Sequence, residues 1–212
     1  MFDRLAEERP AGAVVAGLLT GCALLGFLTG AVLGSAGSGG GTDEVATAAD
    51  AQWEGAVEPL VATVADASCH GESSADAGGN RVTYEPEHAV DDEIESAWRC
   101  EGDGVGETLV LDLGGSVEVA EVGLVPGYAK TDPVDGTDRY AENRRITSVR
   151  WHFDDGTTVE QALDPDTANR ELQSMRIPLR QTAQLVLEIL SSSDASRDRV
   201  AVSDLRISAP VQ

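Results

Sequence analysis

Basic residues are scarce in this chain, and lysine occurs only once, as Lys130. The 212 residues include 15 Lys and Arg against 37 Asp and Glu, which gives a formal net charge of -22. A protein surface of this sign repels phosphate backbones and anionic lipid headgroups. The composition therefore argues against nucleic acid as a partner and against the binding of polyanions in general.

Sequence motifs of catalysis are missing as well. The chain contains no nucleophile elbow, phosphate-binding loop or zinc motif. Its three histidines, His70, His88 and His152, lack the spacing of metal ligands. Carboxylates are so numerous that composition alone explains any close pair, and the low aromatic content of 4% still leaves enough apolar residues for a core. We therefore predict that the protein is not an enzyme.

Long apolar runs are absent except for one near the N-terminus. Residues 11–34 are 24 almost uninterrupted apolar or small residues, a length that spans a bilayer as a helix. Arg4 and Arg9 precede this run, and no Lys or Arg follows before Arg81. The positive-inside rule therefore predicts a single-pass protein of the cell membrane, with residues 1–10 as a cytoplasmic head and the rest of the chain outside.

Two other interpretations of the apolar run stay open. It could be a cleaved signal peptide, although such peptides have a shorter apolar core. Residues 19–22 also resemble a bacterial lipobox, in which the cysteine, here Cys22, is lipidated after cleavage, but residues 23–34 continue apolar. Glycines recur in the run at four-residue spacing, which allows two membrane helices to approach closely as a homodimer. A merely glycine-rich span is the alternative to that dimer.

Two segments with different compositions follow the apolar run. Residues 35–56 are acidic and rich in glycine, which predicts a flexible linker, with a short helix over residues 43–55 as the alternative for its second half. Residues 57–209 contain short alternating strands, and Asp-Asp-Gly at 154–156 predicts a hairpin turn. Roughly eight strands without an amphipathic helix predict an all-β domain, a jelly-roll β-sandwich. The expected strands cover residues 57–64, 109–113, 117–125, 149–153, 174–179, 185–189 and 200–207, and one more starts at Thr157 after the hairpin turn.

The chain has three cysteines, one of which lies in the apolar run. The other two, Cys69 and Cys100, both belong to the region predicted to lie outside the cell. A cysteine pair in an oxidising compartment forms a disulfide more often than a metal site. We therefore predict a disulfide between Cys69 and Cys100, which stabilises the fold by roughly 3–4 kcal/mol on the chain-entropy estimate.

Five fragments in residues 62–207 carry a resemblance to a known family. They are Ala-Val-Asp-Asp-Glu-Ile-Glu-Ser-Ala-Trp at 89–98, Gly-Val-Gly-Glu and the next strand at 104–114, Gly-Tyr-Ala-Lys at 127–130, Tyr-Ala-Glu-Asn-Arg-Arg at 140–145, and Ala-Val-Ser-Asp-Leu at 201–205. Together they resemble a discoidin-like, F5/8 type C domain of the galactose-binding fold. The most similar subgroup is the NADase-type glycan-binding domain, found attached to NAD-hydrolysing enzymes, whereas this sequence predicts no catalytic domain.

The resemblance implies a calcium site, because the acidic turn and the last strand share a calcium ion in related domains. Its implied ligands here are Asp91, Glu93, Ser96 and Asp204, and acidic oxygens in a tight turn suit this cation. The turn departs from the family pattern, because Asp92 stands in place of a glycine and strains the turn if a positive φ is needed there. A structural Ca²⁺ and a metal-free turn held by hydrogen bonds therefore both stay open.

The expected contact surface is the loop from residue 127 to residue 145. It contains Tyr128, Lys130, Tyr140, Asn143 and Arg145, and aromatic faces with amide and guanidinium donors suit a sugar ring. The alternative is structural, with Tyr128 filling the end of the sandwich and with Asn143 and Arg145 holding the loop in place. An exposed aromatic platform on this loop would favour a glycan ligand, and a flat apolar patch on a sheet face would favour a protein partner.

These observations predict a membrane-anchored, non-catalytic recognition module displayed outside the cell. Its expected partners are a glycan or another cell-envelope component, and the lipid bilayer through residues 11–34. The alternative is a structural or interaction protein whose sandwich binds a protein partner.

Overall fold

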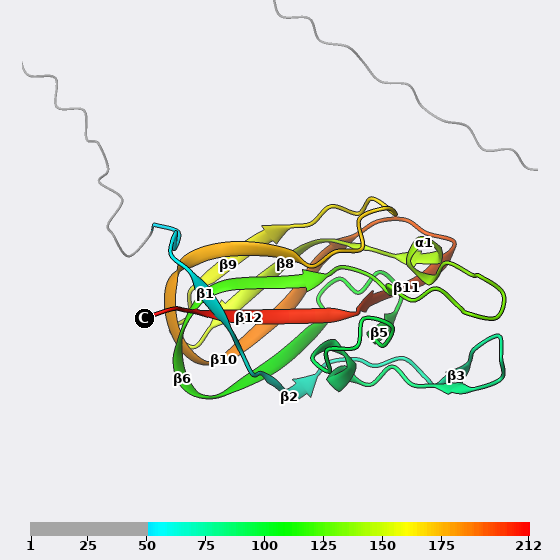
Figure 1. The fold of residues 1–212 in the computed structure, drawn as a ribbon, viewed down its shortest axis with the longest axis horizontal. Helices are drawn as coiled ribbons and strands as arrows, with labels where there is room; N and C mark the ends of the chain where they lie inside the picture. Colours follow the sequence, from blue (N-terminus) through cyan, green and yellow to red (C-terminus); the bar gives the residue numbers. More distant parts are fainter. Residues whose placement is uncertain (1–50) are drawn as a thin grey trace, which may run out of the picture. The chain divides into compact units, whose positions relative to one another are not determined.

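The computed structural model describes residues 51–212, and they form an all-β sandwich domain (Figure 1). The predicted head, transmembrane helix and most of the linker lie outside the described residues. Within residues 51–212, no helix has the length and apolar character needed to cross a membrane. The elements are β1 (Val57–Leu60), β2 (Thr63–Ala67), β3 (Ser74–Ala75), β4 (Arg81–Val82), η1 (Pro86–Ala89), β5 (Trp98–Glu101), β6 (Thr108–Val125), α1 (Arg139–Glu142), β7 (Asn143–Arg144), β8 (Ile146–Phe153), β9 (Thr158–Ala162), β10 (Gln173–Ser192), β11 (Arg197–Val202) and β12 (Asp204–Pro210).

The strands form where apolar residues alternate with polar ones. In β8, Val149, Trp151 and Phe153 are buried while the residues between them are partly exposed, because successive side chains of a strand point to opposite faces. The same alternation buries leucines in β6 and β10. These inward-facing residues belong to one core cluster that also includes Trp98 and Ile207. The predicted all-β architecture is therefore confirmed for the described residues.

Two strands are much longer than the sequence pattern predicted. β6 covers both of the strands expected at 109–113 and 117–125, because Gly114 and Gly115 adopt φ values of 75° and 149° and let the chain bend without leaving the sheet. β10 likewise covers both strands expected at 174–179 and 185–189. Its register against β6 shifts between Thr182 and Gln184, so an irregularity of the strand, and not a loop, separates the two halves.

The predicted strand at 200–207 is in fact two strands in two different sheets. β11 pairs with β5 and β7 in a three-stranded sheet, whereas β12 joins the large sheet, whose order is β1-β12-β6-β10-β8-β9 with β2 also paired to β6. Ser203 lies between them; it is buried, and its hydroxyl accepts a hydrogen bond from the Ala129 amide at 2.9 Å. The stretch at 57–64 is also divided, because β1 pairs with β12 and β2 pairs with β6.

The turn at residues 154–156 forms the predicted hairpin between β8 and β9. Gly156 has a φ of 82°, and its amide donates to the Phe153 carbonyl at 2.9 Å. This is the left-handed conformation that glycine adopts without a steric penalty. The position of the turn was therefore readable from the sequence.

The chain enters the domain beside β1, and the backbone before this strand is already held in place. The Trp53 amide donates to the Ile177 carbonyl at 2.9 Å, and the Arg176 guanidinium donates to the Gly55 carbonyl at 2.9 Å. In Figure 1, this entry point and the C-terminus lie at one end of the sandwich, while α1, β3, β5 and β11 gather at the other end.

Candidate functional site

The acidic turn begins directly after η1, a single 3₁₀ turn opened by Pro86. The Asp91 carboxylate lies at its centre and accepts hydrogen bonds from the Glu93 amide at 3.0 Å and from the Ser96 hydroxyl at 2.8 Å. The imidazole Nδ1 of His88 is a further partner at 2.9 Å. Burial opposes ionisation of this carboxyl, but these hydrogen bonds together hold the pKa of Asp91 below its ordinary value.

Asp92 has a φ of 62°, the left-handed conformation that the sequence comparison associated with a glycine. A non-glycine residue is held there only when its surroundings favour the conformation. The surroundings here include Arg206 of β12, whose Nη2 lies 3.1 Å from the Asp92 carboxylate and whose Nε donates to Asp204 at 2.9 Å. One guanidinium therefore joins the acidic turn to the last strand.

These contacts bear on the predicted calcium ligands. The oxygens of Asp91 and Asp204 already accept hydrogen bonds, and Ser96 donates to both Asp91 and the Glu93 carbonyl. Arg206 also supplies positive charge at the place where the turn meets β12. Among residues 51–212, no group of three or more His, Cys, Asp or Glu is arranged to hold a metal ion. The residues present fit the hydrogen-bonded turn better than a calcium shell, so of the two interpretations we favour the metal-free turn, which a calcium titration tests.

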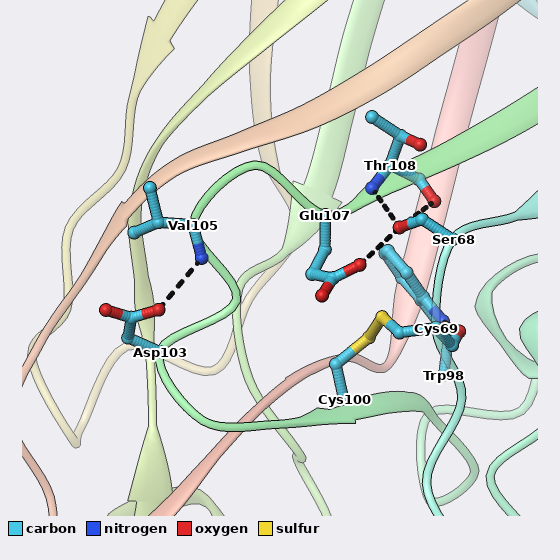
Figure 2. The surroundings of a disulfide bond; sticks show 8 residues. All are labelled: Ser68, Cys69, Trp98, Cys100, Asp103, Val105, Glu107 and Thr108. Carbon is cyan, nitrogen blue, oxygen red and sulfur yellow. Dashed lines mark hydrogen bonds between the residues drawn. A yellow bond between two sulfur atoms is a disulfide. The ribbon is translucent and has the colours of Figure 1, made fainter.

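The predicted disulfide is confirmed, since Cys69 and Cys100 are bonded (Figure 2). The Trp98 indole lies alongside the disulfide, and its N–H donates to the Cys69 carbonyl at 2.8 Å. The preceding residue, Ser68, bonds to the Glu107 carboxylate, and its hydroxyl accepts from the Thr108 amide at 2.7 Å. The disulfide thus fastens the segment before the acidic turn to β5, which follows it.

The three-stranded sheet has two faces with different roles. Trp98 and Cys100 of β5 point into the main core together with Val200 of β11. Because side chains alternate along a strand, Arg99 of β5 and Arg199 of β11 face the opposite way. Both line a cavity of about 320 Å³ at this end of the sandwich, which is at the lower end of the volume range of small-molecule sites.

Two tyrosines form the apolar part of this cavity, which we call the end pocket. Tyr84 and Tyr128 are 5% and 3% exposed, and their rings meet edge to face with centroids 5.9 Å apart. The Tyr84 hydroxyl bonds to Ser74 of β3 at 2.7 Å. Burial raises the pKa of Tyr128 well above its ordinary value, so its hydroxyl stays protonated.

Arg99 is a buried cation with few partners. It is 5% exposed, and its guanidinium carbon lies 3.3 Å from the centroid of the Tyr84 ring. Its Nε has no hydrogen-bond partner. Its Nη2 is 3.5 Å from the Glu72 carbonyl and 3.6 Å from the Glu101 carboxylate, distances at the outer limit of such contacts. Burial lowers the pKa of Arg99, but an arginine remains protonated in proteins.

The two carboxylates of the end pocket are both committed to hydrogen bonds. Asp132 accepts from the Ala77 and Val134 amides at 3.1 Å each and pairs with Arg139 at 3.1 Å. The amides and this guanidinium hold the pKa of Asp132 below its ordinary value. Asp76 accepts from the side chain and amide of Asn80, which lowers its pKa as well. Both carboxyl groups are therefore held in the ionised form.

Three of the five predicted ligand-binding residues line the end pocket: Tyr128, Lys130 and Asn143. Asn143 is 2% exposed; its Nδ2 donates to the Arg139 carbonyl at 2.6 Å, while its Oδ1 has no partner. Lys130 makes no ion pair with any residue that the structure describes. The predicted loop therefore contributes to a cavity, and the role of these residues as ligand contacts stays a prediction.

The other two predicted residues, Tyr140 and Arg145, do not line the end pocket. Tyr140 is fully buried, its hydroxyl donates to the Asn169 carbonyl at 2.7 Å, and burial raises its pKa to about 12. Arg145 donates to the carbonyls of Pro165 and Tyr140 at 2.7 and 3.0 Å. Both therefore fasten the loop, and the exposed aromatic platform that would have favoured a glycan is not formed.

Sequence reasoning missed Tyr84, Arg99 and Arg199 as pocket residues. A signal for Arg99 was present, because it lies between Trp98 and Cys100, residue types that are usually buried. The alternation of a strand then places Arg99 on the opposite face. No local pattern could have indicated that β11 pairs with β5 and brings Arg199 to the same cavity.

Solved structures with a similar fold are carbohydrate-binding modules. CBM32-3 from a family 31 glycoside hydrolase of Clostridium perfringens has a TM-score of 0.51 at 12% identity, covering 72% of this chain and 95% of that one. The family 32 carbohydrate-binding module of Streptococcus pneumoniae EndoD has a TM-score of 0.50 at 11% identity, covering 71% and 98%. At this identity the likeness concerns the fold. No curated protein matches the chain.

The sequence itself matches a family model over residues 62–208, most of the chain and nearly all of the sandwich. The match contains the acidic turn, the disulfide and every element that lines the end pocket. It confirms the resemblance to F5/8 type C domains that the five fragments carried. The chain belongs to the family described as the NAD glycohydrolase translocation F5/8 type C domain.

Proposed function

We propose that this protein is a non-catalytic recognition module that binds a glycan in the end pocket. The observation that carries the proposal is the pocket itself, in which two tyrosine rings lie beside amide, guanidinium and ammonium groups. Sugars present apolar ring faces and many hydroxyls, so a site with aromatic surface and a few convergent polar groups suits them. The likeness of the fold to carbohydrate-binding modules supports the same conclusion.

The absence of catalysis is part of the proposal. Asp76 and Asp132 are the acidic residues of the end pocket, and hydrogen bonds hold the pKa of each below its ordinary value. A general acid near neutral pH needs the opposite shift. The arrangement thus favours holding a ligand over transforming it.

The position of the end pocket suits display from a membrane. Residues of β3, β5, β11 and α1 line the pocket. These elements lie at the end of the sandwich away from the point where the chain enters the domain (Figure 1). If residues 11–34 span the cell membrane as their apolar character predicts, residues 35–56 connect that segment to the far end of the domain. We propose that the domain is held outside the cell with its pocket opposite the point of attachment.

The test uses a variant that blocks the end pocket without removing a buried group. Ala75 of β3 is exposed and lines the pocket, so Ala75→Trp places a large ring at its mouth. Ala162 at the end of β9 is also exposed but does not line the pocket, which makes Ala162→Trp the matched control. The full-length chain and both variants, purified in a mild detergent, are applied to an array of neutral, uronic, sialylated and sulfated oligosaccharides.

We expect glycan binding by the unmodified chain and by Ala162→Trp, and a loss of at least about tenfold in affinity for Ala75→Trp. The melting temperatures of all three proteins should agree closely, because both substitutions are on the surface. Equal glycan binding by the two variants would place the contact surface elsewhere. Failure of the unmodified chain to bind any sugar would refute the proposed function.

The alternative of a protein partner on a sheet face has less support. In residues 51–212, the large apolar side chains that are exposed are Val61, Ile94, Val105, Val134 and Val211. All five lie outside the bounds of the strands, so they do not form the flat apolar patch on a sheet that this alternative requires.

A further inference from the structure

The distribution of charge indicates what kind of sugar the end pocket takes. Five of the 15 basic residues of the chain line this one cavity, whereas only two of its 37 acidic residues do so. The rest of the protein is therefore even more negative than the net charge suggests. Such local enrichment of cations in an acidic protein needs an explanation beyond composition.

The two acidic residues of the pocket leave most of this positive charge unbalanced. Asp132 is paired with Arg139, which also contacts Glu142 at 3.0 Å. Asp76 accepts its hydrogen bonds from Asn80. Neither acid contacts Lys130, Arg99 or Arg199, so these three cations are balanced by other groups or by a ligand.

The groups around these three cations balance them only weakly. Arg199 and Arg99 share a single exposed carboxylate, Glu101, at 3.3 and 3.6 Å. Lys130 has no carboxylate partner within the described part of the chain. A buried guanidinium is costly when it is not fully paired, and Arg99 has an Nε with no acceptor at all. An anion entering the pocket would relieve this imbalance.

The remaining wall of the pocket specifies a sugar and not a bare ion. The rings of Tyr84 and Tyr128 line the pocket, and the Asn143 Oδ1, which has no donor, lies among the pocket residues. A free carboxylate or sulfate ion uses the cations alone. A sugar that carries such a group also supplies hydroxyl donors and an apolar ring face.

We propose that the end pocket binds an acidic sugar, whose carboxylate or sulfate is held by Lys130, Arg199 and Arg99 while its ring lies against the tyrosines. This inference rests on the proposed function and adds the chemical class of the ligand. Carboxylate and sulfate present similar oxygen acceptors to a guanidinium. Because the protein as a whole repels polyanions, the ligand is a terminal or isolated acidic residue of a glycan.

The test compares sugars that differ in one acidic group. The full-length chain in mild detergent is titrated with three pairs: methyl galacturonide and methyl galactoside, sialyllactose and its carboxyl-reduced form, and sulfated and unsulfated galactose. Inorganic sulfate is titrated as the free ion. We expect the acidic member of at least one pair to bind about tenfold or more tightly than its neutral partner, since hydrogen bonds to charged groups contribute about that much. Which pair responds distinguishes carboxylate from sulfate.

Two substitutions then test the residues. Lys130→Gln and Arg199→Gln each remove one positive charge from a partly exposed pocket residue, and Arg150→Gln removes one from β8, outside the pocket. The first two should weaken binding of the acidic sugar by about tenfold and leave its neutral partner unchanged, whereas Arg150→Gln should change neither. Arg99→Gln is less suitable because the residue is buried and its loss could unfold the domain.

The outcomes separate this inference from the proposed function. Neutral sugars that bind as tightly as their acidic partners, with no effect of Lys130→Gln or Arg199→Gln, would overturn the acidic ligand and leave glycan binding intact. Sulfate ion that binds as tightly as the sulfated sugar would overturn the role of the ring. If no member of any pair binds, and the array is also negative, both proposals fail together.

Discussion

Loss of the Cys69–Cys100 disulfide should reduce the stability of the domain by an amount that its loop length sets. The bond joins residues 31 positions apart, and the chain-entropy relation for a loop of that size corresponds to about 3.7 kcal/mol at 25 °C. In a domain of this length, 1 kcal/mol shifts the melting temperature by about 2–4 °C. We therefore expect the bond to contribute about 7–15 °C.

The contacts around the disulfide determine how the native structure responds when the bond is lost. Trp98 is hydrogen-bonded to the Cys69 carbonyl, and Ser68 is bonded to Glu107 and Thr108 independently of the disulfide (Figure 2). The native state should therefore keep its shape when the bond is absent, because the effect is mainly on the unfolded chain. The end pocket should also persist, although Arg99 lies directly before Cys100.

The measurement is urea unfolding of the full-length chain, followed by tryptophan fluorescence, in oxidised and reduced forms. Reduction leaves both sulfur atoms in place and isolates the cross-link. The variant Cys69→Ala/Cys100→Ala also removes a sulfur from a fully buried site, so it should lose somewhat more. Cys22→Ala is the control for the third cysteine. A difference below about 1 kcal/mol between oxidised and reduced protein would refute the chain-entropy reasoning for this loop.

Four further predictions concern other parts of the chain. At pH values above 3.8, the ordinary pKa of Asp, Asp91→Asn should lower the free energy of unfolding of the domain. The difference in this free energy between variant and unmodified protein should shrink as the pH falls below 3.8, because a carboxyl with a lowered pKa loses its stabilising effect once it is protonated. A difference that persists in acid would contradict this reasoning. Calcium added after chelation should leave the melting temperature unchanged, because Arg206 and hydrogen bonds already hold the turn; a rise that Asp91→Ala abolishes would instead establish the metal site. Gly127→Ala should cost about 1–3 kcal/mol in unfolding experiments, because a Cβ there would come within 2.6 Å of the Tyr140 ring; an unchanged free energy of unfolding would contradict this close approach. Full-length protein should remain in the membrane fraction, with the sandwich removable by external protease; mature protein that starts at a lipidated Cys22 or near residue 35 would contradict the anchor.

Much of the sandwich follows from local pattern. The alternation of Val149, Trp151 and Phe153 determined which side of β8 is buried, because the two faces of a strand are set by a period of two residues. The Asp-Asp-Gly turn determined a hairpin, because glycine adopts a positive φ without strain. The cysteine pair, placed on either side of one turn, was enough to predict the bond between them. These features depend on residues close together in the sequence or on chemistry that only one residue type has.

The end pocket depended on the tertiary structure. Its cations come from β5, β11, α1 and the loop around Lys130. Those of β5 and β11 meet only because these two strands pair with each other. A strand pattern shows which side chains share a face, but it does not show which faces of distant strands meet. For the same reason Tyr140, a plausible ligand contact by residue type, is buried beside Gly127 instead. Residue chemistry alone was thus sufficient to suggest a sugar-binding loop, whereas the long-range pairing of strands decided which of its residues face the cavity and gave that cavity its positive charge.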